Sequence, residues 1–244
     1  GRILLHHVLT TTSVLGGSGT SSTFRTLVIT GHEAARVEAA TAGMEGVRCV
    51  RQEPQLGTGH AVQQAVPLLP DAGTTLILNG DVPLIEAATA HALAAACGGT
   101  KLALLTIELA DATGYGRIVR NGKQEVRAIV EHKDASQAQR AIREVYTGML
   151  AAPTAWLKRA VMALENKNAQ KEFYLTDIVA MAVAEGMAVV ATPAKNETEV
   201  LGVNSPLQLA DLERRFQRRQ AEALMEAGVR LADPARFDLR VTLR

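Results

Sequence analysis

One short stretch of the chain follows an apolar run with an acid, an arrangement that could bind a metal ion. Residues 76–78 are all aliphatic, and Asn79-Gly80-Asp81 come directly after them. Such a run suits a strand covered on both faces, so Asp81 would stand at a carboxyl end, where open α/β sheets bind ligands. A carboxylate beside bare glycine backbone suits Mg²⁺ held together with substrate phosphates. The alternative, an Asp81 that caps the next helix, fits the stretch equally well.

A second stretch, Gly57-Thr58-Gly59, could meet an anion or a planar polar group. Residues 61–69 have a helical pattern, so the turn would bring bare backbone amides and a hydroxyl to a helix N-terminus. A plain helix cap is the alternative. The glycine-rich segment 16–22 imitates a phosphate-binding turn, but it follows a helix and precedes a strand, which is the wrong order for such a turn. We therefore expect a surface loop there.

A parallel sheet is expected to position these residues. The predicted strands of the first half are residues 25–30, 47–51, 76–78 and 101–109. The predicted helices are residues 4–14, 33–42, 61–69 and 86–97. Because a helix separates the first two strands, they should form a β-α-β unit with parallel strands and a right-handed crossover.

From residue 110 the pattern becomes antiparallel. Residues 114–120 and 126–131 predict two strands joined by a turn at Asn121-Gly122, the strongest short hairpin signal in the chain. We expect this region to form a lid over the carboxyl edge of the sheet, where Glu131 could hold sugar hydroxyls. The loop 168–177 is dense in hydrogen-bonding groups of the kind a sugar site requires.

A long last helix has a well-marked start. Ser205 can serve as N-cap, Pro206 as first helical residue and Gln208 as capping-box partner, which places Asn204 just outside the helix. The helix carries four positive charges, at Arg214, Arg215, Arg218 and Arg219. Acidic residues flank them and aromatic residues are not interleaved, so a solvated face is favoured over a nucleic-acid surface.

The composition excludes several classes of protein. Apolar residues make up 47% and charged residues 21% of 244 residues with a net charge of +1, so nothing indicates disorder, a membrane or a nucleic-acid partner. Cys49 and Cys97 lie in apolar surroundings and are too few for a disulfide framework, which favours structural thiols in a reducing cytoplasm. We expect a soluble, cytoplasmic globular protein.

Six stretches, taken in order, resemble one family. They are Gln52 with Gln55-Leu56-Gly57-Thr58-Gly59-His60-Ala61, Asn79-Gly80-Asp81-Val82-Pro83-Leu84, Gly114-Tyr115-Gly116-Arg117-Ile118, Ile129-Val130-Glu131-His132-Lys133-Asp134, Tyr174-Leu175-Thr176-Asp177, and Gly202-Val203-Asn204. The family is the bacterial bifunctional UDP-N-acetylglucosamine pyrophosphorylase and glucosamine-1-phosphate N-acetyltransferase, of which this chain resembles the N-terminal uridylyltransferase domain. The resemblance runs from about residue 25 to the end of the chain.

The resemblance implies a reaction and a set of site residues. N-acetylglucosamine 1-phosphate would attack the α-phosphorus of UTP, giving UDP-N-acetylglucosamine, a precursor for cell wall and lipopolysaccharide, and pyrophosphate. Asp81 and Asn204 would hold Mg²⁺ and act in catalysis. The substrate-binding residues would be Gln52, Gly57 and Thr58 at uracil, Asn79 and Gly80 at the nucleotide, and Gly116, Glu131, Tyr146, Tyr174 and Thr176 at the sugar. A pyrophosphorylase for another sugar phosphate or another nucleotide, and a catalytically impaired fragment that only binds nucleotide sugars, are the competing interpretations.

The implied fold is α/β, a Rossmann-like and mostly parallel sheet of the nucleotide-diphospho-sugar transferase type, with a small antiparallel lid and a long C-terminal helix. Residues 1–204 would form the nucleotidyltransferase domain, with 110–185 as its sugar-binding lid lobe, and 205–244 a helical arm. The family's acetyltransferase domain, through which the intact protein would form a homotrimer, has no counterpart here, so we expect this fragment to be monomeric. The family usually has Asn in place of Tyr146 and Gly in place of Lys171.

The family's opening strand and its glycine-rich phosphate loop also have no counterpart, so about 25 residues are expected ahead of Gly1. Loss of several amide and cationic contacts to the triphosphate should cost far more than about 10³-fold in rate. We predict that a chain beginning at Gly1 is poorly stable and inactive, and that about 25 added residues restore UTP-dependent pyrophosphate release. Robust product synthesis by the 244-residue chain, with its mass confirmed, would contradict this.

Overall fold

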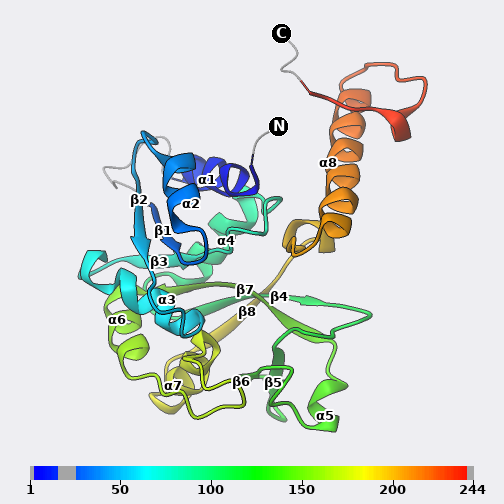
Figure 1. Ribbon diagram of the computed structural model, residues 1–244. Coiled ribbons are helices and arrows are strands. Elements are labelled where there is room, and N and C mark those ends of the chain that lie inside the picture. Colours follow the sequence, from blue (N-terminus) through cyan, green and yellow to red (C-terminus); the bar gives the residue numbers. More distant parts are fainter. Residues whose placement is uncertain (1–2, 16–25, 241–244) are drawn as a thin grey trace.

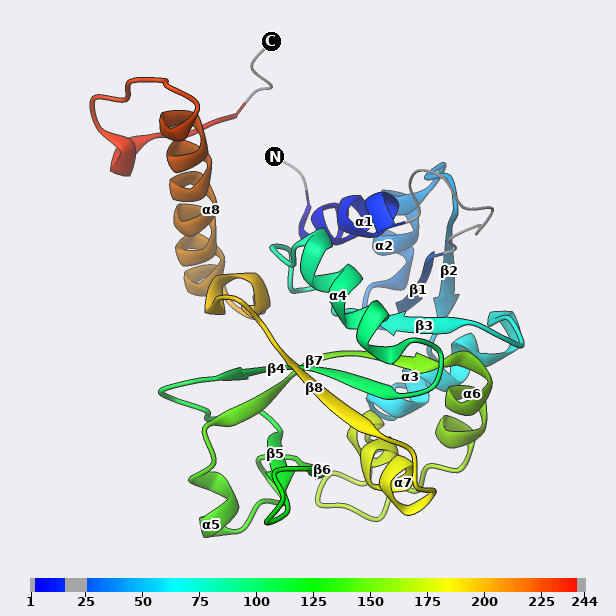
Figure 2. The ribbon, with the colours of Figure 1, turned by 180° about the vertical axis from the view of Figure 1, so that it is seen from behind.

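The computed structural model describes residues 3–15 and 26–240 and contains two sheets with helices packed on them (Figures 1 and 2). The strands are β1 (Thr26–Thr30), β2 (Val47–Arg51), β3 (Thr74–Ile77), β4 (Leu102–Glu108), β5 (Arg117–Arg120), β6 (Val126–Val130), β7 (Glu144–Pro153) and β8 (Val189–Pro193). The helices are α1 (Leu4–Leu15), α2 (Ala34–Thr41), α3 (Thr58–Ala65), α4 (Ala87–Cys97), α5 (Gln137–Arg140), α6 (Thr154–Met162), α7 (Ile178–Ala184) and α8 (Pro206–Glu226). The α/β class is confirmed.

The predicted β-α-β unit is confirmed as a small sheet of its own. β1 and β2 pair in parallel from Thr26 opposite Val47 to Thr30 opposite Arg51, and α2 connects them. The carboxyl ends of both strands therefore lie side by side. The predicted loop 16–22 lies outside the described residues.

The second sheet has six strands and is more antiparallel than expected. Its order is β6-β5-β7-β4-β8, and β3 pairs with β7. β3, β4 and β5 all run antiparallel to β7, and β8 runs parallel to β4, so these four strands share one direction. Their common direction brings the ends of β3 and β8 to the same edge, as a parallel sheet would.

β7 changes its partner along one edge. Its first half pairs with β5 at Val145, and its second half pairs with β3 from Leu150 to Pro153. Between them Gly148 has a left-handed φ of +87°, and a Cβ there would lie 2.1 Å from Asn79 Nδ2. Asn79 Nδ2 also donates to the Thr147 carbonyl at 3.3 Å. The side chain of Asn79, two residues after β3, thus lies beside Thr147 and Gly148, where neither β5 nor β3 pairs with β7.

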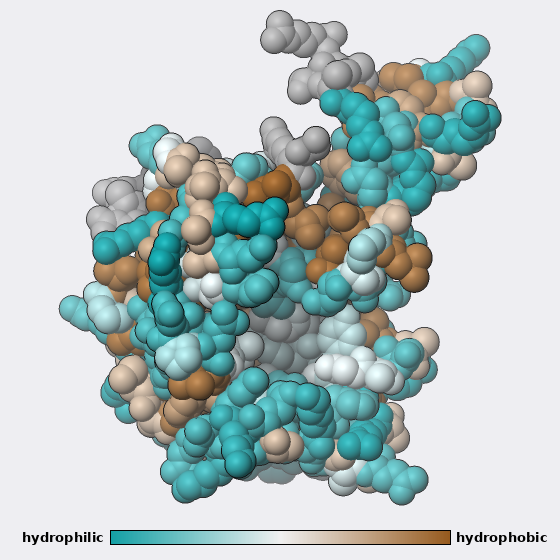
Figure 3. All heavy atoms as spheres, in the orientation of Figure 1, coloured by the Kyte–Doolittle hydropathy of each residue, from teal (hydrophilic) through white to brown (hydrophobic). Residues whose placement is uncertain are grey.

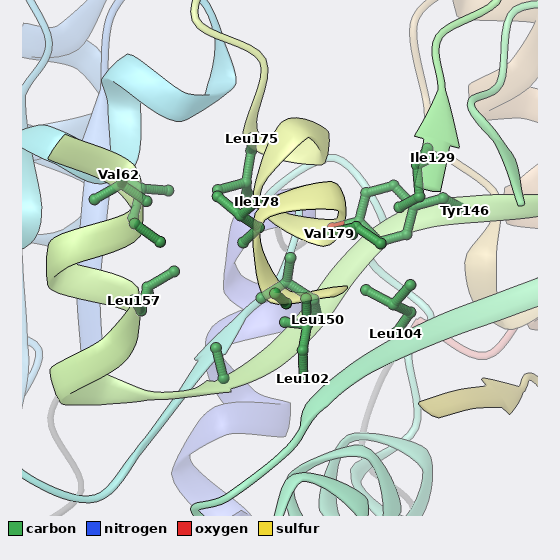
Figure 4. Packing of buried hydrophobic residues seen from close by; sticks show 14 of the residues in the cluster. Val62, Leu102, Leu104, Ile129, Tyr146, Leu150, Leu157, Leu175, Ile178 and Val179 are labelled. Carbon is green, nitrogen blue, oxygen red and sulfur yellow. The ribbon is translucent and has the colours of Figure 1, made fainter. Parts of the chain in front are cut away.

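Two hydrophobic clusters cover the two faces of this sheet. One lies between the sheet and α3, α6 and α7, and Figure 4 shows Val62, Leu157 and Ile178 converging on Leu150. The other lies under α4, with Leu93 and Cys97 against the opposite side chains of β4 and β7. Trp156 belongs to the first cluster at 5% exposure and is part of the core.

Several predicted boundaries were wrong, each for a local reason. The helix predicted over 61–69 begins at Thr58, so the Gly57-Thr58-Gly59 turn is its first turn. The hairpin does not turn at Asn121-Gly122: Asn121 Oδ1 accepts from the amides of Lys123 and Glu125, and the left-handed residue is Gln124, with φ +63°. A longer loop therefore replaces the expected two-residue turn.

The predicted start of α8 is confirmed in part. Ser205 Oγ accepts from the Gln208 amide at 3.2 Å, as an N-cap does, and Pro206 is the first helical residue. The Gln208 side chain accepts from the amide of Asn204 at 2.7 Å instead of that of Ser205. This bond fixes the backbone of Asn204 against the start of the helix.

α8 projects away from the rest of the molecule (Figures 1 and 2). Its four arginines each pair with a carboxylate, of Asp238, Asp211, Glu222 and Glu86 respectively. Figure 3 shows hydrophobic residues gathered at its base, where Leu207 is 81% exposed. Among the described residues, no helix combines the length and the apolar character needed to cross a membrane.

A buried carboxylate holds the segment that leaves β8. Glu199 is fully buried; its Oε2 accepts from the Thr89 hydroxyl at 2.7 Å, and its Oε1 accepts from the amides of Lys195 and Asn196 at 3.1 and 3.4 Å. Because Thr89 lies on α4, these bonds tie the chain after β8 to that helix. They determine where the following residues, up to Asn204, can lie.

We predict that Glu199→Ala lowers the free energy of unfolding by about 3 kcal/mol, since several donors lose their acceptor and each such loss costs about 1–3 kcal/mol when buried. Urea unfolding of both proteins measures the difference. Glu197→Ala, at an exposed acid of the same turn, is the matched control and should change stability by less than about 0.5 kcal/mol. Equal effects of the two changes would contradict the role of Glu199.

Candidate functional site

The side chains of Asp81 and Asn204 lie near each other, on the segments that follow β3 and β8. The Val203 amide donates to the Asp81 carbonyl at 3.0 Å, which joins the segment after β8 to the segment after β3. Gly202 lies between the two side chains: a Cβ there would be 3.3 Å from Asp81 Oδ2 and 3.8 Å from Asn204 Nδ2. The missing side chain leaves a small space beside a carboxylate. Mg²⁺ is commonly held by one or two such protein groups together with phosphate oxygens and water, and this pair fits that pattern.

A second group of predicted residues surrounds Glu131. The Thr176 hydroxyl donates to Glu131 Oε1 at 2.9 Å. A Cβ at Gly116 would lie 3.5 and 3.6 Å from the two carboxylate oxygens and only 2.7 Å from Ile129 Cγ2, so this close approach requires glycine. The Gly116 carbonyl accepts from the Tyr146 amide at 2.9 Å. The structure thus brings four of the predicted sugar residues together.

Burial raises the pKa of the Glu131 carboxyl, and the negative charges of Asp177 and Asp134 add to the rise, while the bond from Thr176 opposes it. Burial likewise raises the pKa of Asp177, with a further contribution from Asp134. A partly buried carboxyl with a raised pKa is a candidate functional group. Burial of its charge costs folding free energy, and such perturbed groups cluster at functional sites.

The side chain of Tyr146 lies in the hydrophobic core. Its ring packs in the first hydrophobic cluster near Ile129 and Val179 (Figure 4), and its hydroxyl is buried without a hydrogen-bond partner among the described residues. Burial, and then the charge of Glu131, raise the pKa of this phenol. Tyr174 is also buried, at 6% exposure. Contacts of either phenol with a sugar remain predictions.

The Gly57-Thr58-Gly59 turn is bound to the loop 172–175. Gly57 has φ +105°, and a Cβ there would lie 2.8 Å from the Phe173 carbonyl, so only glycine fits. The Gly59 amide donates to that carbonyl at 2.7 Å, and Thr58 Oγ1 accepts from the Leu175 amide at 3.1 Å. The turn therefore begins α3 and also holds the loop 172–175.

Gln52 lies close to this turn, at the carboxyl end of β2. Its Nε2 donates to the Gly57 carbonyl at 2.9 Å, and its backbone amide donates to the Thr30 carbonyl at 2.8 Å. It lines a cavity of about 350 Å³ at the ends of β1 and β2, together with Thr30, Gly31, Glu33, Ala34, Ala35, Arg51, Glu53, Pro54 and Gln55. This cavity is large enough for a small planar ligand.

Contacts connect these groups. Thr58 is bonded to Leu175, whose neighbour Thr176 is bonded to Glu131, and Glu131 faces Gly116. Next to Gly116, burial raises the pKa of the Tyr115 phenol, and the negative charges of Glu197 and Asp81 add to the rise. Tyr115 therefore lies near the acid–amide pair. Gly80 is exposed beside Asp81, and a Cβ there would lie 3.5 Å from Leu5 Cδ1 of α1.

Sequence reasoning missed several residues that shape the site. Gly202 was noted only as part of a motif and Gly148 was not singled out, although both admit a neighbouring side chain that a Cβ would obstruct. His60 was quoted in a motif, but its bonds to Gln52 could not be foreseen. Lys171 adopts φ +56° at the position where the resembled family has glycine, so its departure from the motif falls on a left-handed residue.

The arrangement and its comparisons define a class of protein. The model of the MobA-like NTP transferase domain family matches residues 1–146, and the chain belongs to this family. The chain is 69% identical to the bifunctional protein GlmU of Methylibium petroleiphilum over 249 residues, covering 100% of this chain and 53% of the relative. It is 58% identical to the bifunctional protein GlmU of Polaromonas naphthalenivorans, with 98% and 51% covered. It thus spans about half the length of these relatives.

Two solved structures share the fold at low identity. A CMP:2-keto-3-deoxy-manno-octonic acid synthetase complexed with CTP superposes with a TM-score of 0.60 at 17% identity, covering 93% of this chain and 88% of that one. A UDP-glucose pyrophosphorylase complexed with UDP-glucose gives 0.59 at 14%, covering 80% and 79%. These two comparisons concern the fold alone.

We predict that Glu131→Gln stabilises the protein at neutral pH. Because the folded-state pKa of Glu131 is raised above its ordinary value of 4.5, the ionised carboxyl opposes folding at pH 7 and this penalty vanishes as the pH falls below that value. Glutamine keeps an acceptor for Thr176 but carries no charge. Urea unfolding should show a gain over wild type at pH 7 that shrinks toward pH 4. Glu226→Gln, at an exposed acid, should show no such trend, and a gain that grows toward acid pH would contradict the assignment.

Proposed function

We propose that the protein transfers a uridylyl group from UTP to N-acetylglucosamine 1-phosphate. A phosphate oxygen of the sugar phosphate attacks the α-phosphorus of UTP, a new P–O bond forms, and pyrophosphate leaves with the electrons of the broken bond. The products are UDP-N-acetylglucosamine and pyrophosphate. Such transfers depend on positioning and charge neutralisation more than on covalent help from the protein. The family membership and the likeness of this entire chain to about half of the bifunctional GlmU proteins support this proposal.

The observation that carries the proposal is the space at Gly202 between Asp81 and Asn204. We assign these two residues to Mg²⁺, which when bound neutralises charge on the phosphate oxygens of the triphosphate. Asp81 supplies a negative charge at the carboxyl end of β3, and the amide of Asn204 can turn its oxygen toward the same space. Asn79 and Gly80, directly before Asp81, would line the nucleotide.

The base and the sugar have separate places in this proposal. Gln52, which lines the cavity at the ends of β1 and β2, would contact uracil together with Gly57 and Thr58 of the adjoining turn. Gly116, Glu131, Tyr146, Tyr174 and Thr176 would form the sugar side. Glu131 accepts from Thr176 and could accept further from sugar hydroxyls, which would compensate the cost of keeping its charge half-buried.

The same proposal divides the chain. Residues 1–204 would form the nucleotidyltransferase domain, with 110–185 as its sugar-binding lobe, and 205–244 the arm toward a further domain. A different sugar phosphate or nucleotide is the alternative within the class, and a screen of sugar 1-phosphates and nucleoside triphosphates separates these. A fragment that binds nucleotide sugars without turnover is the alternative outside it. Titration with UDP-N-acetylglucosamine and an assay of pyrophosphate release on the same sample distinguish binding from catalysis.

We predict that Asp81→Ala, made in the intact protein, lowers Mg²⁺-dependent pyrophosphate release by at least about 10²-fold and leaves the fold intact, because a charged ligand is lost and one electrostatic contact in a transition state is worth several kcal/mol. Asp71→Ala is the matched control: it removes an exposed acid bound to Lys158, just ahead of β3 and at its opposite end. It should retain full activity. The full-length Methylibium petroleiphilum relative is the positive control, and turnover of Asp81→Ala within tenfold of wild type would sink the assignment.

A further inference from the structure

The segment that carries Asp81 and the segment that leads to Asn204 are joined by two hydrogen bonds. Beside the candidate metal site, the Val203 amide donates to the Asp81 carbonyl at 3.0 Å. At α4, the Thr89 hydroxyl donates to Glu199 Oε2 at 2.7 Å. The two stretches of chain between these bonds therefore form a closed ring, with one closing bond at the site and the other at the first turn of α4.

Apolar side chains of both stretches are buried in one hydrophobic cluster. Val82 and Ile85 belong to the stretch between Asp81 and α4, and Val200 belongs to the stretch after Glu199. A closely packed cluster leaves little room for one of its members to move without the others. A displacement of one stretch at α4 is therefore passed on to the bond between Val203 and Asp81.

The closing bond at α4 is made to a buried charge. Glu199 is fully buried, and its donors are neutral: the Thr89 hydroxyl, the backbone amides of Lys195 and Asn196, and the Asn196 side chain at 3.5 Å. Oε1 accepts from the turn that contains Glu199 itself, whereas Thr89 is the donor to Oε2 among the described residues. Loss of that hydroxyl would leave a buried, charged oxygen without a donor, which costs more than the loss of a bond between neutral groups.

Thr89 is a fixed point of reference for this carboxylate. It is buried in the first turn of α4, and the same helix packs Leu93 and Cys97 against β4 and β7. The positive N-terminal end of the helix also favours a negative charge beside it. The position of Thr89 relative to the sheet therefore determines where Glu199, and the turn that carries it, can lie.

We propose that Thr89 is a positioning residue for the metal pair: through Glu199 it holds the chain after β8 so that Asn204 lies within reach of the ion that Asp81 binds. The inference rests on the proposed Mg²⁺ site of the nucleotidyl transfer. It extends that proposal to a residue that contacts neither the metal nor a substrate. Metal affinity in proteins commonly depends on such supporting hydrogen bonds.

Hydrogen–deuterium exchange of the metal-free, intact protein tests the connection itself. Thr89→Val keeps the shape of the side chain but lacks the hydroxyl, so the amides of residues 200–204 should exchange about tenfold faster, the equivalent of about 1.4 kcal/mol for one hydrogen bond. Thr89→Ser keeps the hydroxyl and should exchange within twofold of wild type. Thr89→Ala, which places no methyl group beside the carboxylate, is the second variant without a hydroxyl and serves if Thr89→Val does not fold.

Binding of Mn²⁺ tests the consequence for the metal. Mn²⁺ takes the same oxygen ligands as Mg²⁺, and the electron paramagnetic resonance signal of the free ion reports how much remains unbound. In the presence of UDP-N-acetylglucosamine, Thr89→Val should bind Mn²⁺ about tenfold more weakly than wild type, and Thr89→Ser within twofold. Asp81→Ala defines the binding that belongs to the proposed site.

Thr154→Val is the matched control for a general loss of stability. Thr154 is also a buried threonine, and its hydroxyl is bonded to that of Thr75 at 2.9 Å, near the start of β3 and thus at the opposite end of the strand from Asp81. This variant should lower the midpoint of thermal unfolding, yet leave Mn²⁺ affinity and the exchange of residues 200–204 within twofold of wild type.

Three results would overturn the inference. They are hydroxyl-free variants at Thr89 with wild-type exchange or Mn²⁺ affinity, a Thr89→Ser variant as impaired as they are, and a Thr154→Val variant that weakens Mn²⁺ binding equally. Wild-type Mn²⁺ binding that Asp81→Ala does not alter would overturn the metal assignment together with the inference. Absence of pyrophosphate release from wild type, with the differences at Thr89 intact, counts against the reaction alone.

Discussion

The site depends on the place where β7 changes its partner. β5 and β3 share one edge of this strand, and between them Gly148 removes its side chain and adopts φ +87°. Asn79 enters this place and bonds to the Thr147 carbonyl. If a strand paired there instead, the chain after β3 would continue along the sheet, and Asp81 would not turn toward the segment that leaves β8. A break in strand pairing is thus what creates the edge at which ligands of α/β proteins bind.

The loops around this place are held mainly by one another. Thr58 is bonded to Leu175, Thr176 to Glu131, and Val203 to Asp81, and each bond joins segments that are distant in sequence. The rigid elements supply only the anchor points. Glu131 illustrates the energetic cost, because burial opposes its charge and, among the residues that the structure describes, only the side-chain bond from Thr176 compensates for it. Polar groups left short of partners at such a point are typical of sites that bind a ligand.

Much of the fold could be predicted from local pattern. The β-α-β unit, the strand before Asp81 and the cap of α8 follow from periodicity and from residues with one strong preference, such as Pro206. The prediction of a two-residue hairpin turn was wrong because the side chain of Asn121 accepts hydrogen bonds from the amides of Lys123 and Glu125. The dipeptide Asn-Gly alone does not indicate this alternative. The extent of antiparallel pairing was underestimated because β7 pairs with three strands, which no short window reveals.

The proposed site residues were found by motif, and the structure adds which of them lie together. Gly116, Glu131, Tyr146 and Thr176 converge, although the sequence separates the first from the last by a whole lobe. What sequence could not supply was orientation. The ring of Tyr146 enters the core, and the amide of Gln52 donates inward, because neighbours far along the chain determine both. Residue types indicate which chemical groups are present, whereas packing determines which atom of each side chain faces the site.

α8 is joined to the surroundings of the site at two points. Asn204 directly precedes the helix, and Arg219 on the helix binds Glu86, which lies five residues after Asp81 and just before α4. His7 of α1 and Phe216 add an edge-to-face ring contact at the same level. The segments that carry Asp81 and Asn204 therefore both lead to contacts with α8, so the direction of this helix is set by the same part of the chain that sets the site.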